Sequence, residues 1–204
     1  MKKIALAIMA MLAVGTGSAN ATPSLCSTIA GNLVQNCGFE SGSFSSWNTT
    51  PAPSGSLFGV GGSGHTGSFD AFFGATGGMP DQIFQNVLTM PGHLYDLEFY
   101  FNSDGLTPNG AFVGYIDTSF HQLGGGPNLP QFDWTLEAFT FTATTNFTQI
   151  RFGAQDQQGF LLLDDVVLRD VTVPEPFTLG MFGAGLAGAF AMRRRKSHRK
   201  NISA

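Results

Sequence analysis

Carboxylates are the most numerous side chains in this sequence that could carry chemistry. Thirteen Asp or Glu residues lie between Thr22 and Val173, where Arg151 and Arg169 are the only basic residues. Two carboxylates could in principle hydrolyse a glycosidic bond, but no pair stands out among so many acids. The three histidines of this stretch have no metal-binding spacing, and no nucleophile elbow precedes a helix. The residues therefore predict no catalytic group, and the protein is expected not to be an enzyme.

Two aromatic residues are candidates for ligand binding, because sugar rings commonly stack on exposed aromatic side chains. Tyr100 lies on the polar face of an alternating segment, and Trp134 follows a Pro/Gly-rich loop. Both are expected to be accessible to a ligand. The alternative is that they pack on a sheet face.

The N-terminus is typical of a secretory signal peptide. Lys2 and Lys3 give a positive start, Ile4–Val14 is an apolar run, and residues 19–21 form a small-x-small cleavage site. The apolar run is too short for a membrane anchor and is followed by a cleavage site. Residues 1–21 are therefore predicted to be removed.

The C-terminal residues 173–204 contain three segments in a fixed order. They are Val173, Pro174, Glu175 and Pro176, then an apolar run over residues 177–192, then the basic cluster of Arg193, Arg194, Arg195 and Lys196. At about 1.5 Å per residue the apolar run spans roughly 24 Å as a helix, which makes it a marginal transmembrane helix. The basic cluster would keep this end in the cytoplasm, so the preceding domain would lie outside the inner membrane.

This order of segments resembles the PEP-CTERM sorting signal of exported proteins in Gram-negative bacteria. The resemblance implies that the C-terminal helix holds the protein in the membrane only briefly. An exosortase-type membrane protease would then cleave near Pro174-Glu175-Pro176. The product would reach the cell surface or an extracellular polysaccharide matrix.

Cys26 and Cys37 are the only cysteines of the chain. In an oxidising periplasm, a pair this close is predicted to form a disulfide. Closing so short a loop would stabilise the fold by about 3 kcal/mol in the chain-entropy account. Two free thiols are the alternative.

Residues 22–172 are predicted to form one all-β domain, an antiparallel β-sandwich. Several segments alternate apolar and polar residues with period two and are separated by Gly, Pro and Asn turns. The predicted strands are Asn32–Cys37, Phe69–Phe73, Asp81–Leu88, His93–Asn102, Ala111–Ile116, Thr135–Thr142, Phe147–Gly153 and Phe160–Val171. The glycine-rich stretch Gly59–His65 precedes no helix and is therefore expected to be a loop rather than a phosphate-binding loop.

Three segments carry a second resemblance. Asn32–Glu40 reads NLVQNCGFE and is followed by Trp47, Ile83–Tyr95 holds a possible hairpin, and Phe160–Val166 ends in Asp-Asp-Val. In this order they resemble galactose-binding-like jelly rolls, which include several families of carbohydrate-binding modules. The resemblance implies a jelly-roll fold in which Trp47 belongs to the core.

The jelly-roll resemblance also implies a structural calcium site between the first loop and the last strand. Carried over by motif, the candidate ligands are Glu40, Asp164 and Asp165, and backbone carbonyls would complete the oxygen shell. Strand alternation places Asp164 inward with Leu162 and Val166, and Asp165 on the opposite face. The alternatives are that Asp164 accepts backbone N–H bonds and that Asp165 faces solvent.

The charge distribution limits the partners. The domain is strongly acidic and the tail is basic, so a phosphate backbone would be repelled and nucleic acid is excluded as a partner. Calcium and neutral polymers are more compatible partners. The sequence thus favours an exported, exopolysaccharide-associated protein, with a membrane-anchored carbohydrate-binding module and a glycan hydrolase as alternatives.

Overall fold

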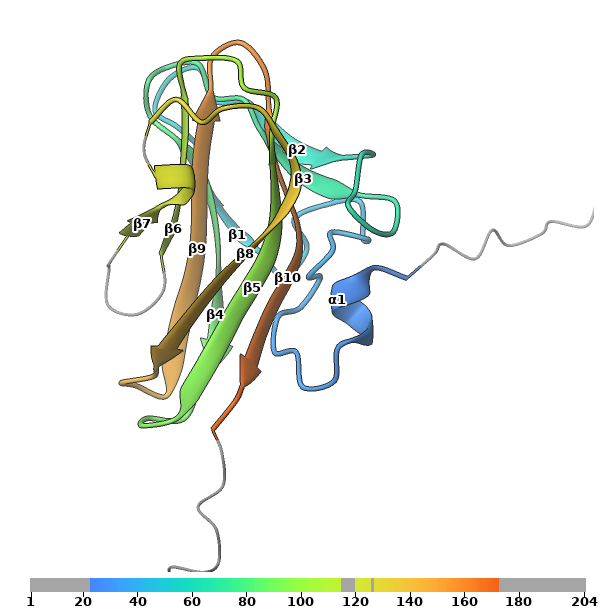
Figure 1. The fold of residues 1–204 in the computed structure, drawn as a ribbon, viewed down its shortest axis with the longest axis vertical. Helices are drawn as coiled ribbons and strands as arrows, with labels where there is room; N and C mark the ends of the chain where they lie inside the picture. The colour runs from blue at the N-terminus through green and yellow to red at the C-terminus, as the bar shows by residue number, and fades with distance from the viewer. Residues whose placement is uncertain (1–22, 115–119, 126, 173–204) are drawn as a thin grey trace, which may run out of the picture.

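The strands of this protein form two sheets that pack face to face (Figure 1). The computed structural model describes residues 23–114, 120–125 and 127–172. Each sheet has five strands, and all neighbouring strands run antiparallel. In this part of the chain the helices are one short turn at Leu25–Thr28 (α1) and one 3-10 turn at Leu123–Gly125 (η1). The predicted all-β antiparallel sandwich is confirmed.

The strand order brings distant parts of the chain together. In spatial order, sheet A consists of β1 (Asn48–Thr50), β4 (Asp81–Leu88), β9 (Phe147–Asp156), β6 (Asn109–Gly114) and β7 (Phe120–Gln122). Sheet B consists of β2 (Phe58–Gly61), β3 (Asp70–Phe73), β10 (Leu161–Asp170), β5 (Leu94–Ser103) and β8 (Phe132–Thr142). Each outer face is therefore built from residues that are far apart in sequence.

One predicted strand is wrong. Asn32–Cys37 forms turns, because the side-chain oxygen of Asn32 accepts hydrogen bonds from the N–H groups of Val34 (3.1 Å) and Leu168 (3.0 Å). Asn36 also has a left-handed φ of 48°, which a strand does not allow. The other predicted strands are present, Asp81–Leu88 with the predicted ends and the rest with shifted ends. β1, β2 and β7 were not predicted, and β2 occupies part of the glycine-rich stretch that was expected to be a loop.

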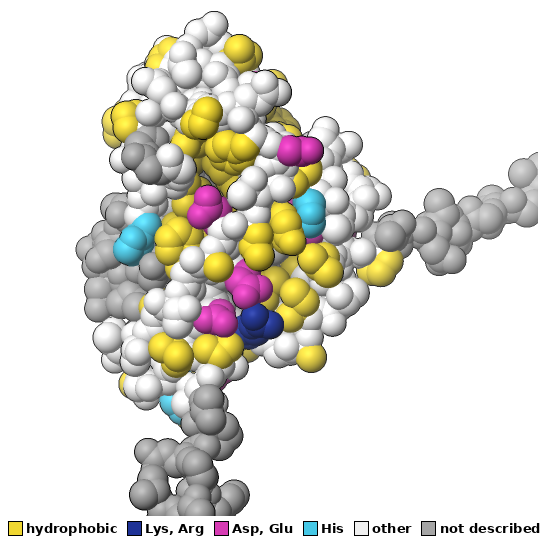
Figure 2. Space-filling model, in the orientation of Figure 1, with side chains coloured by type: hydrophobic (Ala, Val, Ile, Leu, Met, Phe, Trp, Pro, Cys, Tyr) yellow, Lys and Arg dark blue, Asp and Glu magenta, His cyan; other side chains and the backbone are white. Residues whose placement is uncertain are grey.

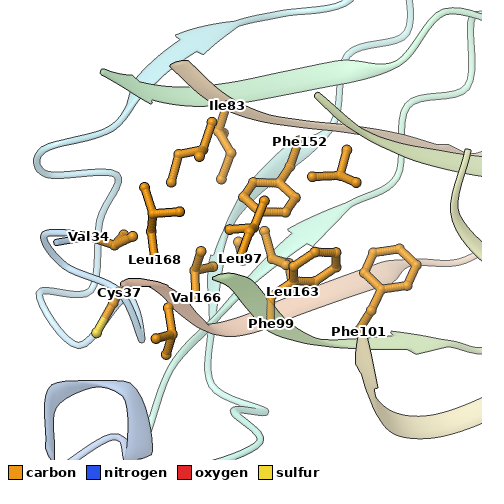
Figure 3. Close-up of a cluster of buried hydrophobic side chains, with 14 of the residues drawn as sticks. Val34, Cys37, Ile83, Leu97, Phe99, Phe101, Phe152, Leu163, Val166 and Leu168 are labelled. Carbon is orange, nitrogen blue, oxygen red and sulfur yellow. The ribbon is translucent and has the colours of Figure 1, made fainter. Parts of the chain in front are cut away.

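The core lies between the sheets and is built mainly by alternation. Leu97, Phe99 and Phe101 of β5 are buried, and their neighbours on the strand are half-buried. Figure 3 shows these side chains pointing toward Phe152 of β9. The rings of Phe152 and Phe99 meet edge to face, with 4.9 Å between their centroids. Each buried side chain of this size contributes roughly 1.5–3 kcal/mol. The aromatic residues thus fill the space between the two sheets.

Trp47 belongs to this core, as the resemblance implied. It is 6% exposed and its ring stacks on Phe39 at 5.7 Å. Its indole N–H donates to the backbone oxygen of Asn36 at 3.2 Å, which satisfies the one polar atom that burial would leave without a partner.

The predicted disulfide between Cys26 and Cys37 is present. Both cysteines are buried, and the N–H of Val166 in β10 donates to the carbonyl oxygen of Cys37 at 2.9 Å. The disulfide therefore fastens α1 and the turns that follow it to the central strand of sheet B.

The predicted signal peptide at 1–21 lies outside the described residues, and so does the whole predicted C-terminal segment 173–204 with its Pro-Glu-Pro motif, its helix at 177–192 and its basic cluster. A search of the described residues finds no helix with the length and apolar character to cross a membrane.

We expect the double variant Cys26→Ser/Cys37→Ser to lose about 3 kcal/mol of free energy of unfolding, because its unfolded chain is no longer cross-linked. Urea unfolding of the purified protein measures this loss. Reducing agent should lower the stability of the wild type by the same amount and leave the variant unchanged. Equal stability of the oxidised wild type and the variant would contradict the prediction.

Candidate functional site

Carboxylates from two distant segments hold the loop 63–69, which connects β2 to β3. Glu40 accepts hydrogen bonds from the backbone N–H groups of Ser68 (2.9 Å) and of the residue after it (3.1 Å). Asp164 of β10 accepts one from the N–H of Thr66 (3.2 Å). The loop is thereby fixed on the outside of sheet B.

Asp165 makes the densest set of contacts with this loop. One of its oxygens accepts the hydroxyl of Thr66 (2.6 Å) and lies 2.9 Å from Nδ1 of His65. Its other oxygen accepts the N–H of Cys26 at 3.0 Å. Asp165 thus connects β10 to the loop and to the disulfide-bonded segment.

The prediction that Asp164 points inward and Asp165 to the opposite face is wrong. Asp164 pairs with Tyr100 on the outer side of sheet B, and both carboxylates contact the loop 63–69 there. Asp164 and Asp165 are both buried, with 0% and 2% of their surface exposed. A β-bulge interrupts the pairing of β10 with β5 between Asp164 and Val167, and Asp165 has a left-handed φ of 50°. A bulge breaks the period-two alternation, so consecutive side chains point to the same side.

The structure brings the three predicted calcium ligands to a single loop, which the sequence could not show. Their oxygens accept N–H and O–H groups, and the described residues contain no group of three or more His, Cys, Asp or Glu that could hold a metal ion. The arrangement is therefore not a preformed cation site. A calcium ion would have to displace these donors, and calcium binding by Glu40, Asp164 and Asp165 stays a prediction.

Burial strongly perturbs one of these carboxylates. It raises the pKa of Asp164 to about 8, and the adjacent charge of Asp165 contributes to the rise. The backbone N–H groups of Asp165 and Thr66 act in the opposite direction, because they stabilise the ionised form. Asp164 therefore holds a proton in the folded protein at neutral pH.

The two predicted ligand-binding aromatics come together on the outer face of sheet B. The ring of His65 stacks on that of Tyr100, with 3.6 Å between the ring centroids and 16° between the planes. The centroid of the Trp134 ring lies 5.8 Å from that of His65. Tyr100 and Trp134 are half-buried, and Leu136, which pairs with Tyr100 across β5 and β8, is 50% exposed. Hydrophobic side chains occur along this face in Figure 2. Ligand binding by Tyr100 and Trp134 stays a prediction, since their contacts with His65 also stabilise the loop.

The outer face of sheet A carries a second candidate site, which was not predicted from the sequence. Gln82, Gly153, Phe112 and Gln122 pair in one row across β4, β9, β6 and β7. A groove of about 550 Å³ lies over this row and extends to Gln155. The groove combines an aromatic ring with several amides, which is the composition of a site for a neutral, hydroxyl-rich ligand.

A glycine fixes the position of the ring in this groove. A Cβ on Gly153 would lie 2.3 Å from Cζ of Phe112, so the ring rests directly over the backbone of β9. The half-buried Phe112 therefore lies across the sheet. Any side chain at position 153 would displace the ring.

Gln155, which lines the groove, has an unsatisfied acceptor. Its Oε1 atom is buried and accepts no hydrogen bond in the described structure. Leaving a buried acceptor without a donor costs about 1–3 kcal/mol. Because this atom has almost no accessible surface, it is not presented to a ligand in the groove.

A sequence signal for this face exists, although it is weak. Outward positions of β4 and β9 hold amides (Gln82, Asn86, Gln149 and Gln155) between inward apolar residues. Their repetition at alternate positions of two strands indicates a polar binding face more than a plain solvent-exposed one. Only the strand pairing places them beside Phe112.

Comparison with protein families gives one match. Residues 172–196 match the PEP-CTERM protein-sorting motif, which confirms the sorting signal predicted from the C-terminus. The motif indicates export and sorting toward the cell surface. A comparison with curated protein sequences finds no match.

Comparison with solved structures confirms the jelly-roll-like sandwich. TmCBM61, solved in complex with beta-1,4-galactotriose, is 17% identical with a TM-score of 0.52, over 68% of this chain and 98% of that one. The CBM22-1 xylan-binding domain of Paenibacillus barcinonensis Xyn10C is 14% identical with a TM-score of 0.50, over 67% and 93% of the two chains. The enzymatically active domain of tailspike protein 4 from bacteriophage CBA120 is 16% identical with a TM-score of 0.52, over 69% of this chain but 21% of that one. At such identities the likeness concerns the fold alone.

The raised pKa of Asp164 predicts a pH-dependent stability. Between about pH 4 and pH 8 the folded protein keeps a proton that the unfolded chain has lost. Unfolding therefore releases this proton, and the free energy of unfolding falls with rising pH by at most about 1.4 kcal/mol per unit.

We expect Asp164→Asn to reduce this fall and the exposed control Asp133→Asn to keep it, both measured by urea unfolding in EDTA. Burial also raises the pKa of Asp70 and Asp156. In Asp164→Asn the free energy of unfolding should therefore still fall with rising pH, but less steeply. Stability that rises with pH in the wild type would contradict the prediction. Replacing EDTA with Ca²⁺ tests the calcium prediction, because a bound cation would keep Asp164 ionised and flatten the slope.

Proposed function

We propose that this protein is exported, released from the membrane by an exosortase-type protease, and retained outside the cell by binding polysaccharide without cleaving it. In this proposal the signal peptide 1–21 directs export and the helix 177–192 serves as a temporary anchor. The outer face of sheet A forms the binding surface.

The sorting part of the proposal rests on the PEP-CTERM motif at residues 172–196. The distribution of charge supports it, since the basic residues cluster at the two ends of the chain and the acidic residues in the domain between them. Basic flanks of an apolar run stay in the cytoplasm. The charges are therefore consistent with a single orientation, in which the acidic domain lies outside the inner membrane and the basic C-terminal end lies in the cytoplasm.

The binding part rests on one observation: the ring of Phe112 lies close over the backbone of Gly153 in a groove bordered by glutamine amides. A sugar ring presents C–H groups on its faces and hydroxyls on its rim. An aromatic platform contacts the faces, and each amide offers both donors and acceptors to the hydroxyls.

Two solved structures of similar fold support this choice of ligand class, because one is a complex with beta-1,4-galactotriose and the other is a xylan-binding domain. The tailspike domain of similar fold is described as enzymatically active, but this chain spans 21% of it. A hydrolase therefore remains a second candidate, and activity screening on glycans tests it.

We expect the wild type to bind polysaccharides on a glycan array and Phe112→Ala to bind about tenfold more weakly, because the aromatic platform is lost. Gly153→Ala should weaken binding with Phe112 still present, since the added methyl displaces the ring. Melting temperatures of both variants show whether the fold is intact.

Trp134→Ala and Tyr100→Ala are the matched controls, because they remove aromatics from the opposite face. The groove on sheet A predicts that both retain binding. Loss of binding in these two variants, with Phe112→Ala unaffected, would move the site to sheet B and support the prediction made from sequence.

The sorting proposal predicts that the protein recovered from the medium or cell surface ends near Pro174-Glu175-Pro176. Mass spectrometry of the purified protein measures its C-terminal mass. Alanine substitution of the three residues should keep the chain intact and in the membrane. An intact C-terminus through Ala204 in the released wild-type protein would contradict the proposal.

A further inference from the structure

The acidic domain contains two basic side chains, and they have different surroundings. Arg169 lies on the outer face of sheet B, where its Nη2 is 2.8 Å from Glu98 and 3.8 Å from Asp96. The basic side chain visible in Figure 2 lies against acidic ones. The charge of Arg169 is therefore neutralised within the fold.

Arg151 lies on the outer face of sheet A and has no such neutralisation. In the described part of the chain no carboxylate forms an ion pair with it. Its guanidinium lies over the ring of Phe84 at 4.3 Å and is held by two glutamine oxygens, those of Gln149 and Gln82. Among the described residues, no carboxylate therefore neutralises the charge of this half-buried arginine.

The hydrogen bonds of Arg151 leave donors for a ligand. Nε and Nη2 donate to Oε1 of Gln149 at 3.0 and 2.8 Å, and Nη1 donates to Oε1 of Gln82 at 2.8 Å. A guanidinium has five N–H donors in a planar arrangement. Two therefore remain, on a group whose orientation the glutamines and Phe84 already fix.

Acidic side chains are absent from the described outer face of sheet A. The two carboxylates within its described strand residues, Asp81 and Asp156, are 0% and 1% exposed and face inward. The outward positions of β4, β9, β6 and β7 hold amides, aromatics, glycines, one leucine and Arg151. In a domain with thirteen acids, this face is the one where a negative ligand would meet a cation and no repelling charge.

We propose that the ligand of this face is an acidic polysaccharide and that Arg151 binds the carboxylate of a uronic acid residue. This inference rests on the proposed glycan-binding function and specifies its ligand class. Arg151 lies two residues from Gly153 along β9, a distance of about 7 Å, and it shares Gln82 with the groove. One sugar over Phe112 and a charged neighbour over Arg151 therefore fit a continuous chain.

The chemistry of the guanidinium favours a carboxylate. Arginine binds carboxylates through two parallel N–H bonds, and such charge-assisted bonds are about twice as strong as neutral ones. The acidic domain as a whole repels a polyanion at long range. Selectivity must therefore come from the direct contact with Arg151. Removing the guanidinium should abolish the preference for acidic over uncharged polysaccharide.

The test compares acidic polymers with their uncharged forms. Polygalacturonate, alginate and glucuronoxylan are each titrated into the exported protein beside the same polymer with its carboxyl groups reduced to alcohols. We expect the wild type to bind at least one acidic polymer about tenfold or more tightly than its reduced form. Arg151→Gln should bind both forms equally, and Arg151→Lys should keep a weaker preference because a lysine lacks the planar pair of donors.

Arg169→Gln is the matched control and should keep the wild-type preference, since it removes the same charge from the opposite face. Equal binding of acidic and reduced polymers by the wild type would overturn this inference and leave the proposed function standing. A preference that persists in Arg151→Gln would also overturn it. Binding of none of the six polymers would overturn both.

Discussion

Buried carboxylates in a domain that is almost free of basic side chains are the constraint on which this structure depends. An ionised group without a partner in the interior is very costly, and here ion pairs are scarce. Asp164 and Asp165 are instead satisfied mainly by backbone N–H groups and hydroxyls, most of them from the loop 63–69, which also donates one hydrogen bond to Asp70. Glu40 binds the same loop. The loop therefore acts as the counterpart of these acids and joins the N-terminal segment to the central strand of sheet B.

The two outer faces follow from this arrangement. On sheet B, the loop places His65 against Tyr100, so the aromatic residues there have a structural partner. The acids of that face also pair with Arg169. Sheet A has no exposed carboxylate among its described strand residues, and its amides lie beside Phe112 and Arg151. Sheet A is therefore the face that we propose for ligand binding.

The fold was largely predictable because the signals that specify it are local. Alternation along residues 94–103 places Leu97 and Phe99 inward from sequence alone. The prediction failed at Asn32, where side-chain hydrogen bonds form turns in place of strand pairing. It also failed at Asp164 and Asp165, where a β-bulge interrupts the alternation of side chains. The disulfide and the sorting motif were predictable because both depend on residues close together in the chain.

The sequence by itself determined the class of protein: a sorted, mostly acidic chain with a β-sandwich between two terminal segments. Only the tertiary structure decided where ligands could bind. Gln82, Phe112 and Gly153 come from three strands, and they become neighbours only because β9 pairs with β4 on one side and β6 on the other. Such pairing depends on register between distant segments, and a shift of one residue would turn every one of these side chains into the core.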